Sequence, residues 1–372
     1  MNARGRAALA LLAVLAAVPL TAPAQELPVG RVRFLSGFEA RGVRFDAGLG
    51  LKSVSELVLP VGAIWAVTPK LSLDFGVRYA RATRTPEEDS LPTTSVSGPT
   101  DVQVRGAYQL VPDAVVLTIS ANVPTGKTKL TADELPAAGA VASDLIPFPV
   151  SSFGSGANVT SGLALAMPVA GWALGFGGSY RLSGAYAPLA GIDSSYRAAA
   201  EFRFRVGADR LVGQGRVSLG FTYSSFSHDE FGGSEIFRPG KRYITQASWS
   251  FPIGNGGLSL YAWDLYRSAG TVALGGSSTE KQNVLAAGAV ASIQVGRSVL
   301  RPQVEFRQQS AGLDTWETAG RLLGLSVRYQ MPLTESLSLL PALRYDTGNV
   351  VSDGATIGFT GWGLSLGLRT TL

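Results

Sequence analysis

The stretch ISANVPTGKT, residues 119–128, satisfies the relaxed phosphate-loop pattern. A small residue, Ala121, is followed by four residues and then by Gly126, Lys127 and Thr128. A phosphate loop needs a strand before it, a helix after it, and glycines that let backbone N–H groups surround the phosphates. Here Ala121 replaces the first glycine, and the residues that follow hold one short helix candidate among several breakers. The stretch therefore predicts a strand end and a loop in which Lys127 is a solvated charge.

A histidine-dependent active site is the other chemistry to consider. A barrel lipase or protease needs a Ser–His or Asp–His arrangement, and the sequence contains one histidine, His228, in SFSHDEFGG. Beside Asp229 and Glu230 it could bind a stray metal ion, but a designed metal site needs three or four ligands at fixed spacing. We therefore expect no catalytic, cofactor or metal site, and the sequence predicts a protein that is not an enzyme.

The first 24 residues predict export. Arg4 and Arg6 precede an apolar run that ends in Ala22-Pro23-Ala24, the arrangement of a cleaved secretory signal. A single membrane anchor is the alternative, although the run is near the lower length limit for a spanning helix. The chain has no cysteine. Its net charge is +5, but no run of basic residues indicates nucleic-acid binding. The sequence thus predicts a signal peptide at residues 1–24 and a single exported domain at residues 25–372.

Period-2 alternation identifies the elements of that domain. In KLSLDFGVRYAR, residues 70–81, apolar side chains occupy the odd positions, and small or charged ones occupy the even positions. In EFRFRV, residues 201–206, two phenylalanines alternate with two arginines. Sixteen such segments are expected, near 36–45, 53–67, 71–83, 101–110, 114–124, 157–169, 172–183, 195–206, 215–227, 241–252, 257–267, 284–295, 298–309, 320–331, 336–346 and 358–372.

Three features favour a membrane barrel over a soluble sandwich. The strands approach the 9–11 residues of a tilted membrane strand, aromatic residues recur at the ends of their apolar faces, and short turns alternate with long loops. The final segment, GWGLSLGLRTTL, resembles the C-terminal signal that the barrel-assembly machinery reads. We therefore expect an all-β fold: an antiparallel up-and-down transmembrane β-barrel of about 16 strands, or 14 if two weak segments fail, in the bacterial outer membrane.

One part of the chain resembles a known family. The segments TDVQVRGAYQL, ISANVPTGK, SSFGSGANVTSGLAL and GGSYRLSGAY are similar to the MetA-pathway of phenol degradation family, over about residues 55–190. Its best marks are Pro-Thr-Gly at a strand end and the later Gly-Ser-Gly, whereas Thr100-Asp101 stands where members often have Gly-Asp. The resemblance implies an outer-membrane channel for small hydrophobic or aromatic molecules.

The alternation also predicts which charged side chains line the lumen. Arginines outnumber acids there, which either creates an anion-favouring field or reflects paired charges that hold the wall together. Two functions stay open: a channel for small molecules, among them aromatic or hydrophobic compounds, and a porin-like or structural barrel without a dedicated ligand. The expected partners are outer-membrane lipid, small solutes and the assembly machinery. The lumen-lining candidates are Asp74, Arg78, Asp101, Arg105, Arg181, Arg197, Glu201, Arg203, Arg205, Arg216, Arg242, Arg301, Glu305, Arg307, Arg328, Arg344 and Asp346.

Overall fold

The computed structural model describes residues 27–273 and 275–372. The predicted signal peptide, residues 1–24, lies outside the described residues. Within the described part, no helix has the length and apolar character required to span a membrane.

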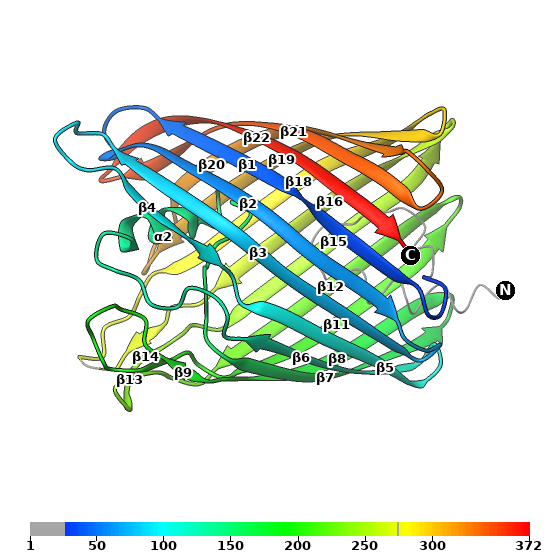
Figure 1. Ribbon diagram of the computed structural model, residues 1–372, viewed down its shortest axis with the longest axis horizontal. Coiled ribbons are helices and arrows are strands. Elements are labelled where there is room, and N and C mark those ends of the chain that lie inside the picture. The colour runs from blue at the N-terminus through cyan, green and yellow to red at the C-terminus, as the bar shows by residue number, and fades with distance from the viewer. Residues whose placement is uncertain (1–26, 274) are drawn as a thin grey trace.

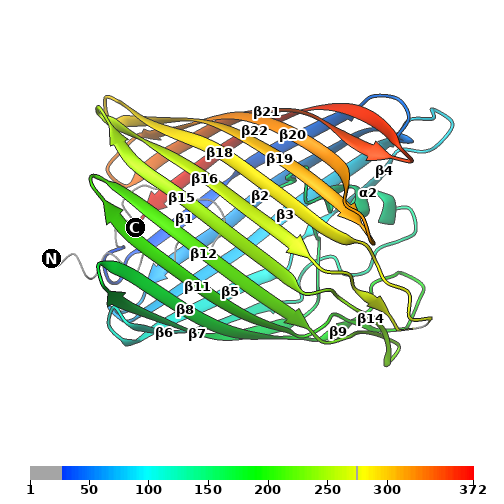
Figure 2. The same cartoon turned by 180° about the vertical axis from the view of Figure 1, so that it is seen from behind.

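Sixteen antiparallel wall strands close into a barrel, because β1 pairs with β2 on one side and with β22 on the other (Figures 1 and 2). The prediction of sixteen strands is confirmed, and fourteen is excluded. The wall strands are β1 (Val32–Phe45), β2 (Leu51–Ala66), β3 (Leu71–Pro86), β5 (Val102–Val111) preceded by β4 (Thr94–Pro99), β6 (Val115–Val123), β7 (Asn158–Val169), β8 (Trp172–Ser183), β11 (Glu201–Val212), β12 (Gly215–Phe226), β15 (Arg242–Ile253), β16 (Gly256–Arg267), β18 (Lys281–Val295), β19 (Ser298–Gly312), β20 (Glu317–Pro332), β21 (Leu337–Ser352) and β22 (Ala355–Thr371).

β4 and β5 together occupy one position in the wall. β4 pairs with the second half of β3, from Tyr79 to Arg84, and β5 pairs with its first half, from Leu71 to Gly76. The interruption falls at Thr100 and Asp101, the two residues between the segments. Only β5 continues the ladder to β6, so the break leaves room beside β4 for the connection that follows β6.

The outer connections differ from the predicted long loops in two ways. The predicted strands 336–346 and 358–372 extend through the loop expected between them, because β21 and β22 continue to a tight turn in which Asp353 has a φ of 50°. Other outer connections build a second sheet of five short strands. Its members are β9 (Ala185–Tyr186), β10 (Tyr196–Arg197), β13 (Asp229–Phe231), β14 (Ser234–Arg238) and β17 (Thr271–Val272).

The predicted strand 195–206 is therefore wrong as a single element. Its first residues form β10 in the outer sheet, whereas the wall strand β11 begins at Glu201. The break at Ala198–Ala200 carries no alternating polar residue that would reveal it in the sequence.

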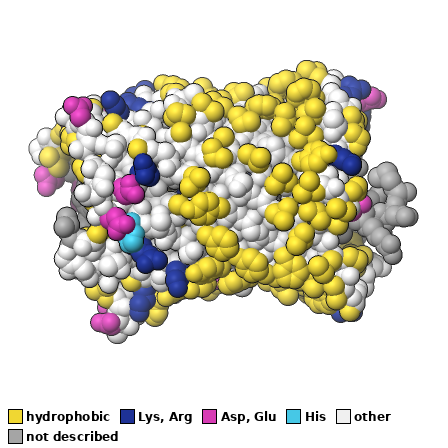
Figure 3. Space-filling model, turned by 90° about the horizontal axis from the view of Figure 1, so that it is seen from below, with side chains coloured by type: hydrophobic (Ala, Val, Ile, Leu, Met, Phe, Trp, Pro, Cys, Tyr) yellow, Lys and Arg dark blue, Asp and Glu magenta, His cyan; other side chains and the backbone are white. Residues whose placement is uncertain are grey.

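An apolar belt surrounds the wall. Figure 3 shows hydrophobic side chains over the middle of the barrel and charged side chains gathered toward its two ends. On β11, Phe202 and Phe204 are 47% and 38% exposed on the outer face, whereas Glu201 is 3% exposed on the inner face. A closed barrel satisfies its backbone hydrogen bonds internally and presents apolar side chains to hydrocarbon. The protein is thus an integral protein of the bacterial outer membrane.

The belt supports a first prediction, concerning Phe204. Phe204→Arg places a charge on the outer face, at a cost of about 2–4 kcal/mol near the bilayer midplane. We expect the fraction that refolds into lipid vesicles, measured by the mobility shift on boiling, to fall well below that of a Phe204→Leu control. Equal refolding of the two variants would mean that this face of β11 does not contact lipid.

The connection between β6 and β7, residues 124–157, enters the barrel instead of covering it. We call it the inner loop. It carries one helix, α2 (Leu135–Val141), seen inside the outer half of the barrel in Figure 1. Ala137 and Val141 of α2 are buried against inward-facing Val58 of β2 and Val96 of β4. Burial of a side chain such as that of Val141 contributes about 1.5–3 kcal/mol, so the inner loop is packed against the wall.

Candidate solute pathway through the barrel

One carboxylate holds both ends of the inner loop. Asp101, at the break between β4 and β5, accepts a hydrogen bond at Oδ1 from the backbone N–H of Gly126, with a distance of 3.0 Å. Its Oδ2 accepts bonds from the backbone N–H and the hydroxyl of Ser155, at 2.7 and 3.1 Å. Asp101 is 6% exposed. We call this arrangement of Asp101, Gly126 and Ser155 the clasp.

The clasp explains why glycine stands at position 126. A Cβ there would lie 2.5 Å from the carbonyl oxygen of Phe153 and 2.7 Å from Asp101 Oδ1, so no other residue fits without movement of the backbone. The same close approach shows that the two ends of the inner loop lie side by side. The loop therefore leaves the wall and returns to it at one point.

Lys127 is not the solvated loop charge that the sequence predicted. Its ammonium group pairs with the carboxylate of Glu134 at the start of α2, and its side chain is 30% exposed. Burial opposes ionisation of Glu134, yet hydrogen bonds from Lys127 and Thr131 hold the pKa of this carboxyl below its usual range. The phosphate-loop lysine is thus engaged within the inner loop.

The middle of the inner loop, at Asp144, is hydrogen-bonded to the wall opposite the clasp. Asp144 accepts two bonds from the guanidinium of Arg267 on β16, at 2.6 and 3.2 Å. Its carbonyl oxygen accepts a third from Arg307 on β19, at 3.3 Å. On the other side, the Val150 N–H donates to Glu56 of β2, at 3.2 Å. The inner loop therefore crosses the lumen and narrows it.

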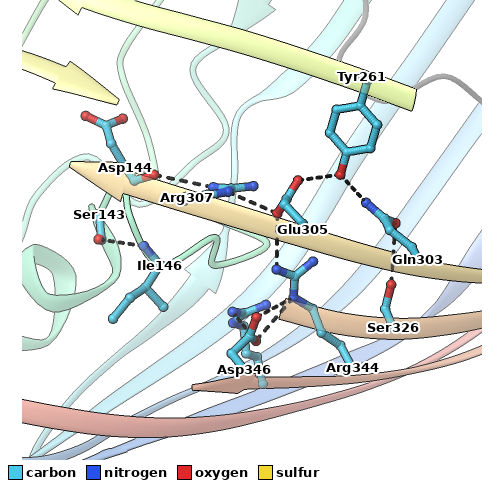
Figure 4. A network of polar contacts seen from close by, with 11 residues as sticks. Ser143, Asp144, Ile146, Tyr261, Gln303, Glu305, Arg307, Ser326, Arg344 and Asp346 are labelled. Carbon is cyan, nitrogen blue, oxygen red and sulfur yellow. Dashed lines mark hydrogen bonds and ion pairs between the residues drawn. The ribbon is translucent and has the colours of Figure 1, made fainter. Parts of the chain in front are cut away.

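Beneath this crossing, charged side chains from three wall strands form one network (Figure 4). Glu305 accepts hydrogen bonds from Arg307, Arg344 and Tyr261, at 3.0, 3.2 and 2.9 Å. Asp346 pairs with Arg344 at 2.9 Å and with Arg41 of β1 at 2.7 Å. Both carboxylates are buried, and each has at least two arginine partners, as buried charges require.

A second group of arginines lies on β8, β11 and β15. Glu201 accepts two bonds from Arg203, at 2.9 and 2.7 Å, and lies 3.4 Å from Arg181. Arg205 and Arg242 form no salt bridge among the described residues, and their Nε atoms are buried there without a hydrogen-bond partner. The arginines around Glu201 therefore carry more positive charge than this carboxylate balances.

The structure places the remaining predicted site residues as follows. Asp74 and Arg105 pair across β3 and β5, with Arg105 Nε 2.6 Å from Asp74 Oδ2. Arg216 pairs with Asp209 at 3.0 Å. Arg197 is the exception: it belongs to the outer sheet, where it lies 3.2 Å from Glu230. It is therefore not a residue of the barrel wall.

Several charged residues on the inner face were not identified from the sequence. Arg41 and Glu56 lie within strands whose alternation was evident, and extending that alternation would have found them. Asp209 lies beyond the predicted strand end at residue 206, and Arg267 is the last residue of the predicted strand 257–267. Asp144 belongs to the inner loop, whose path no local pattern predicts.

A cavity of about 880 Å³ lies below the inner loop, in the half of the lumen nearer the two termini. Pro149 and Val150 of the inner loop contribute to it from above, and β1 to β3 and β19 to β22 form its walls. Its charged lining is unequal, with five arginines and two acids. These are Arg33, Arg78, Arg301, Arg328, Arg369, Glu39 and Asp101.

His228 lies in an outer connection, away from this cavity. Its Nδ1 is 3.2 Å from a carboxylate oxygen of Glu235. In the described part of the chain, no group of three or more potential ligands is arranged to hold a metal ion.

No family model matches the chain, and no curated protein matches it. The resemblance of residues 55–190 to the phenol-degradation family therefore stays a prediction. Among solved structures, the CymD monoaromatic hydrocarbon channel is 10% identical, with 92% of this chain and 89% of that chain covered and a TM-score of 0.44. OmpT, an outer-membrane protein of Vibrio cholerae, is 12% identical over 93% and 100% of the chains, with a TM-score of 0.42. The translocator domain of autotransporter NalP from Neisseria meningitidis is 11% identical over 93% and 90%, with a TM-score of 0.35. At these identities the likeness concerns the barrel fold alone.

Proposed function

We propose that the protein is a passive channel that lets small solutes cross the outer membrane through the lumen beside the inner loop. The observation that carries the proposal is the inner loop itself. This 34-residue connection (residues 124–157) is held at both ends by the clasp and is bonded to the opposite wall at Asp144. A barrel that served only as a scaffold would gain nothing from such a connection. A narrowed lumen with a cavity beneath it is the arrangement that selects solutes by size and charge.

The charges beside the inner loop favour anions. Arg205 and Arg242 project inward without a salt bridge among the described residues, and the cavity below contains more arginines than acids. Unpaired guanidinium groups attract anions and repel cations in a narrow, partly wet lumen. We therefore expect the channel to conduct chloride better than potassium.

A structural barrel without a dedicated ligand is the second candidate, and the Glu305 network favours it. There the arginines are paired with buried carboxylates, which is the pattern of charges that stabilise a wall. The two functions are separated by conductance. Purified protein in a planar bilayer should form discrete channels if solutes pass, and no channels if the lumen is closed.

The second prediction uses two neighbouring arginines of β11. Arg205→Ala removes a charge that has no salt-bridge partner among the described residues. A unit charge acting across about 10 Å of water attracts chloride by about 0.4 kcal/mol and repels potassium by the same amount. The two effects together should lower the chloride-to-potassium permeability ratio about fourfold. Reversal potentials measured across a salt gradient report this ratio. An unchanged ratio in an Arg205→Ala channel of normal conductance would contradict the anion-favouring field.

Arg203→Ala is the matched comparison, because Arg203 pairs with a carboxylate that is 3% exposed. Its loss leaves Arg181 as the one salt-bridge partner of Glu201 among the described residues, so we expect a lower urea midpoint of unfolding. We therefore expect Arg203→Ala to act mainly on stability and Arg205→Ala to act mainly on ion selectivity.

A further inference from the structure

We propose that the cavity below the inner loop binds small organic anions in which one carboxylate is joined to an apolar body. This inference rests on the proposed channel function and names the class of solute that the channel takes.

Four inward-facing wall positions that line the cavity carry no side chain. Gly37 pairs with Gly367 across β1 and β22, and Gly62 pairs with Gly76 across β2 and β3. All four glycines line the cavity. At Gly76 a Cβ would meet nothing within 4 Å, so the lumen beside this part of the wall is open space.

Two neighbouring arginines give the cavity a positively charged side. Arg301 and Arg328 occupy paired positions on β19 and β20, and both line the cavity. Neither forms a salt bridge among the described residues, and the Nε of Arg301 is buried there without a hydrogen-bond partner. Two adjacent guanidinium groups repel each other, and a bound carboxylate relieves this repulsion while accepting paired N–H bonds. The charged end of the ligand is therefore assigned to Arg301 and Arg328.

The same cavity is lined by apolar side chains from other elements, namely Leu35 of β1, Ile64 of β2, Leu340 of β21 and Val150 of the inner loop. A small inorganic anion would leave this apolar surface in contact with water. A carboxylate that carries an aromatic or branched aliphatic body would cover it, and burial of that body strengthens binding.

Binding of sodium benzoate to the purified, folded barrel tests the proposal by isothermal titration calorimetry. Benzyl alcohol supplies a closely similar body without the charge, and acetate supplies the charge without the body. We expect benzoate to bind at least about tenfold more tightly than either, since each probe lacks one of the two contacts. Equal binding of benzyl alcohol would overturn the anion site, and equal binding of acetate would overturn the apolar half.

Two variants locate the site. Arg301→Gln combined with Arg328→Gln should weaken benzoate binding by about tenfold or more, whereas Arg81→Gln, on the outer face of β3, should leave it unchanged. Gly76→Leu fills the hollow without changing any charge, and it should also weaken binding. Its control is Gly178→Leu, since Gly178 of β8 has open space around a Cβ but is paired with outward-facing Phe204 and lies outside the cavity. Benzoate binding that survives both cavity variants would overturn the assignment.

The outcomes separate this inference from the proposed function. Conductance in the bilayer without benzoate binding would leave the channel standing and overturn the solute class. Benzoate binding without conductance would support the site and overturn passage through the lumen.

Discussion

Excising most of the inner loop should raise the single-channel conductance severalfold. Residues 127–153 can be replaced by two glycines, because Gly126 and Ser155 bind the same carboxylate and Gly126 approaches Phe153 closely. The excision removes α2 and the crossing at Asp144, which together narrow the lumen. The wall keeps every strand pairing, since none of these residues belongs to the ladder between β6 and β7. Conductance in a planar bilayer measures the effect.

The control is a shorter deletion in a connection that does not enter the barrel. Residues 88–91 lie between β3 and β4, where Asp89 is 95% exposed, and the connection protrudes from the outer end in Figure 1. Their removal should leave the conductance unchanged. An excised channel that conducts no better than the unmodified protein would show that the inner loop does not limit the flow of ions.

The same excision bears on benzoate binding. Val150 contributes an apolar side chain to the cavity from above, whereas Arg301 and Arg328 belong to the wall. We therefore expect the excised barrel to retain the charged contact and lose part of the apolar one. Such a partial loss would assign the inner loop a role in solute choice as well as in pore size.

The wall of this barrel could be predicted from the sequence because alternation is a local signal. Phe202 and Phe204 face out and Arg203 and Arg205 face in, as the period of two requires. The same signal misplaced Arg197, because the chain leaves the alternating pattern at Ala198 and resumes it at Glu201. Local patterns do not record such an interruption when the intervening residues are all small.

The inner loop could not be predicted, because long-range contacts determine its path. Asp101 was identified as an inward-facing acid, but its partners lie 25 and 54 residues later in the chain. The motif around Gly126 was visible in the sequence. The need for glycine at this position comes from the close approach of Phe153 and Asp101, which only the fold brings together. Pro-Thr-Gly at the strand end and Gly-Ser-Gly at the return are thus the two halves of one clasp.

Asp101→Ala should open the clasp and lower the stability of the inner loop by about 3 kcal/mol or more. Three hydrogen bonds to a charged acceptor disappear, and two backbone N–H groups are left without a partner in a mostly buried site. Lys127 and Lys129 stand next to the clasp, so limited trypsin digestion of the folded barrel reports its opening directly. We expect cleavage after these lysines to accelerate, whereas Asp89→Ala should digest like the unmodified protein.

Asp101→Asn sharpens this test, because the two backbone N–H groups bind different oxygens of the carboxylate. An amide offers one acceptor oxygen in place of two, so Asn can satisfy Gly126 or Ser155 but not both. Its digestion rate should therefore fall between those of Asp101→Ala and the unmodified protein. Identical rates for all three proteins would mean that the apolar contacts of α2 and the Asp144–Arg267 pair hold the loop without the clasp. If the clasp acts only through the inner loop, Asp101→Ala should change the conductance of the full-length channel and should not change it once residues 127–153 are gone.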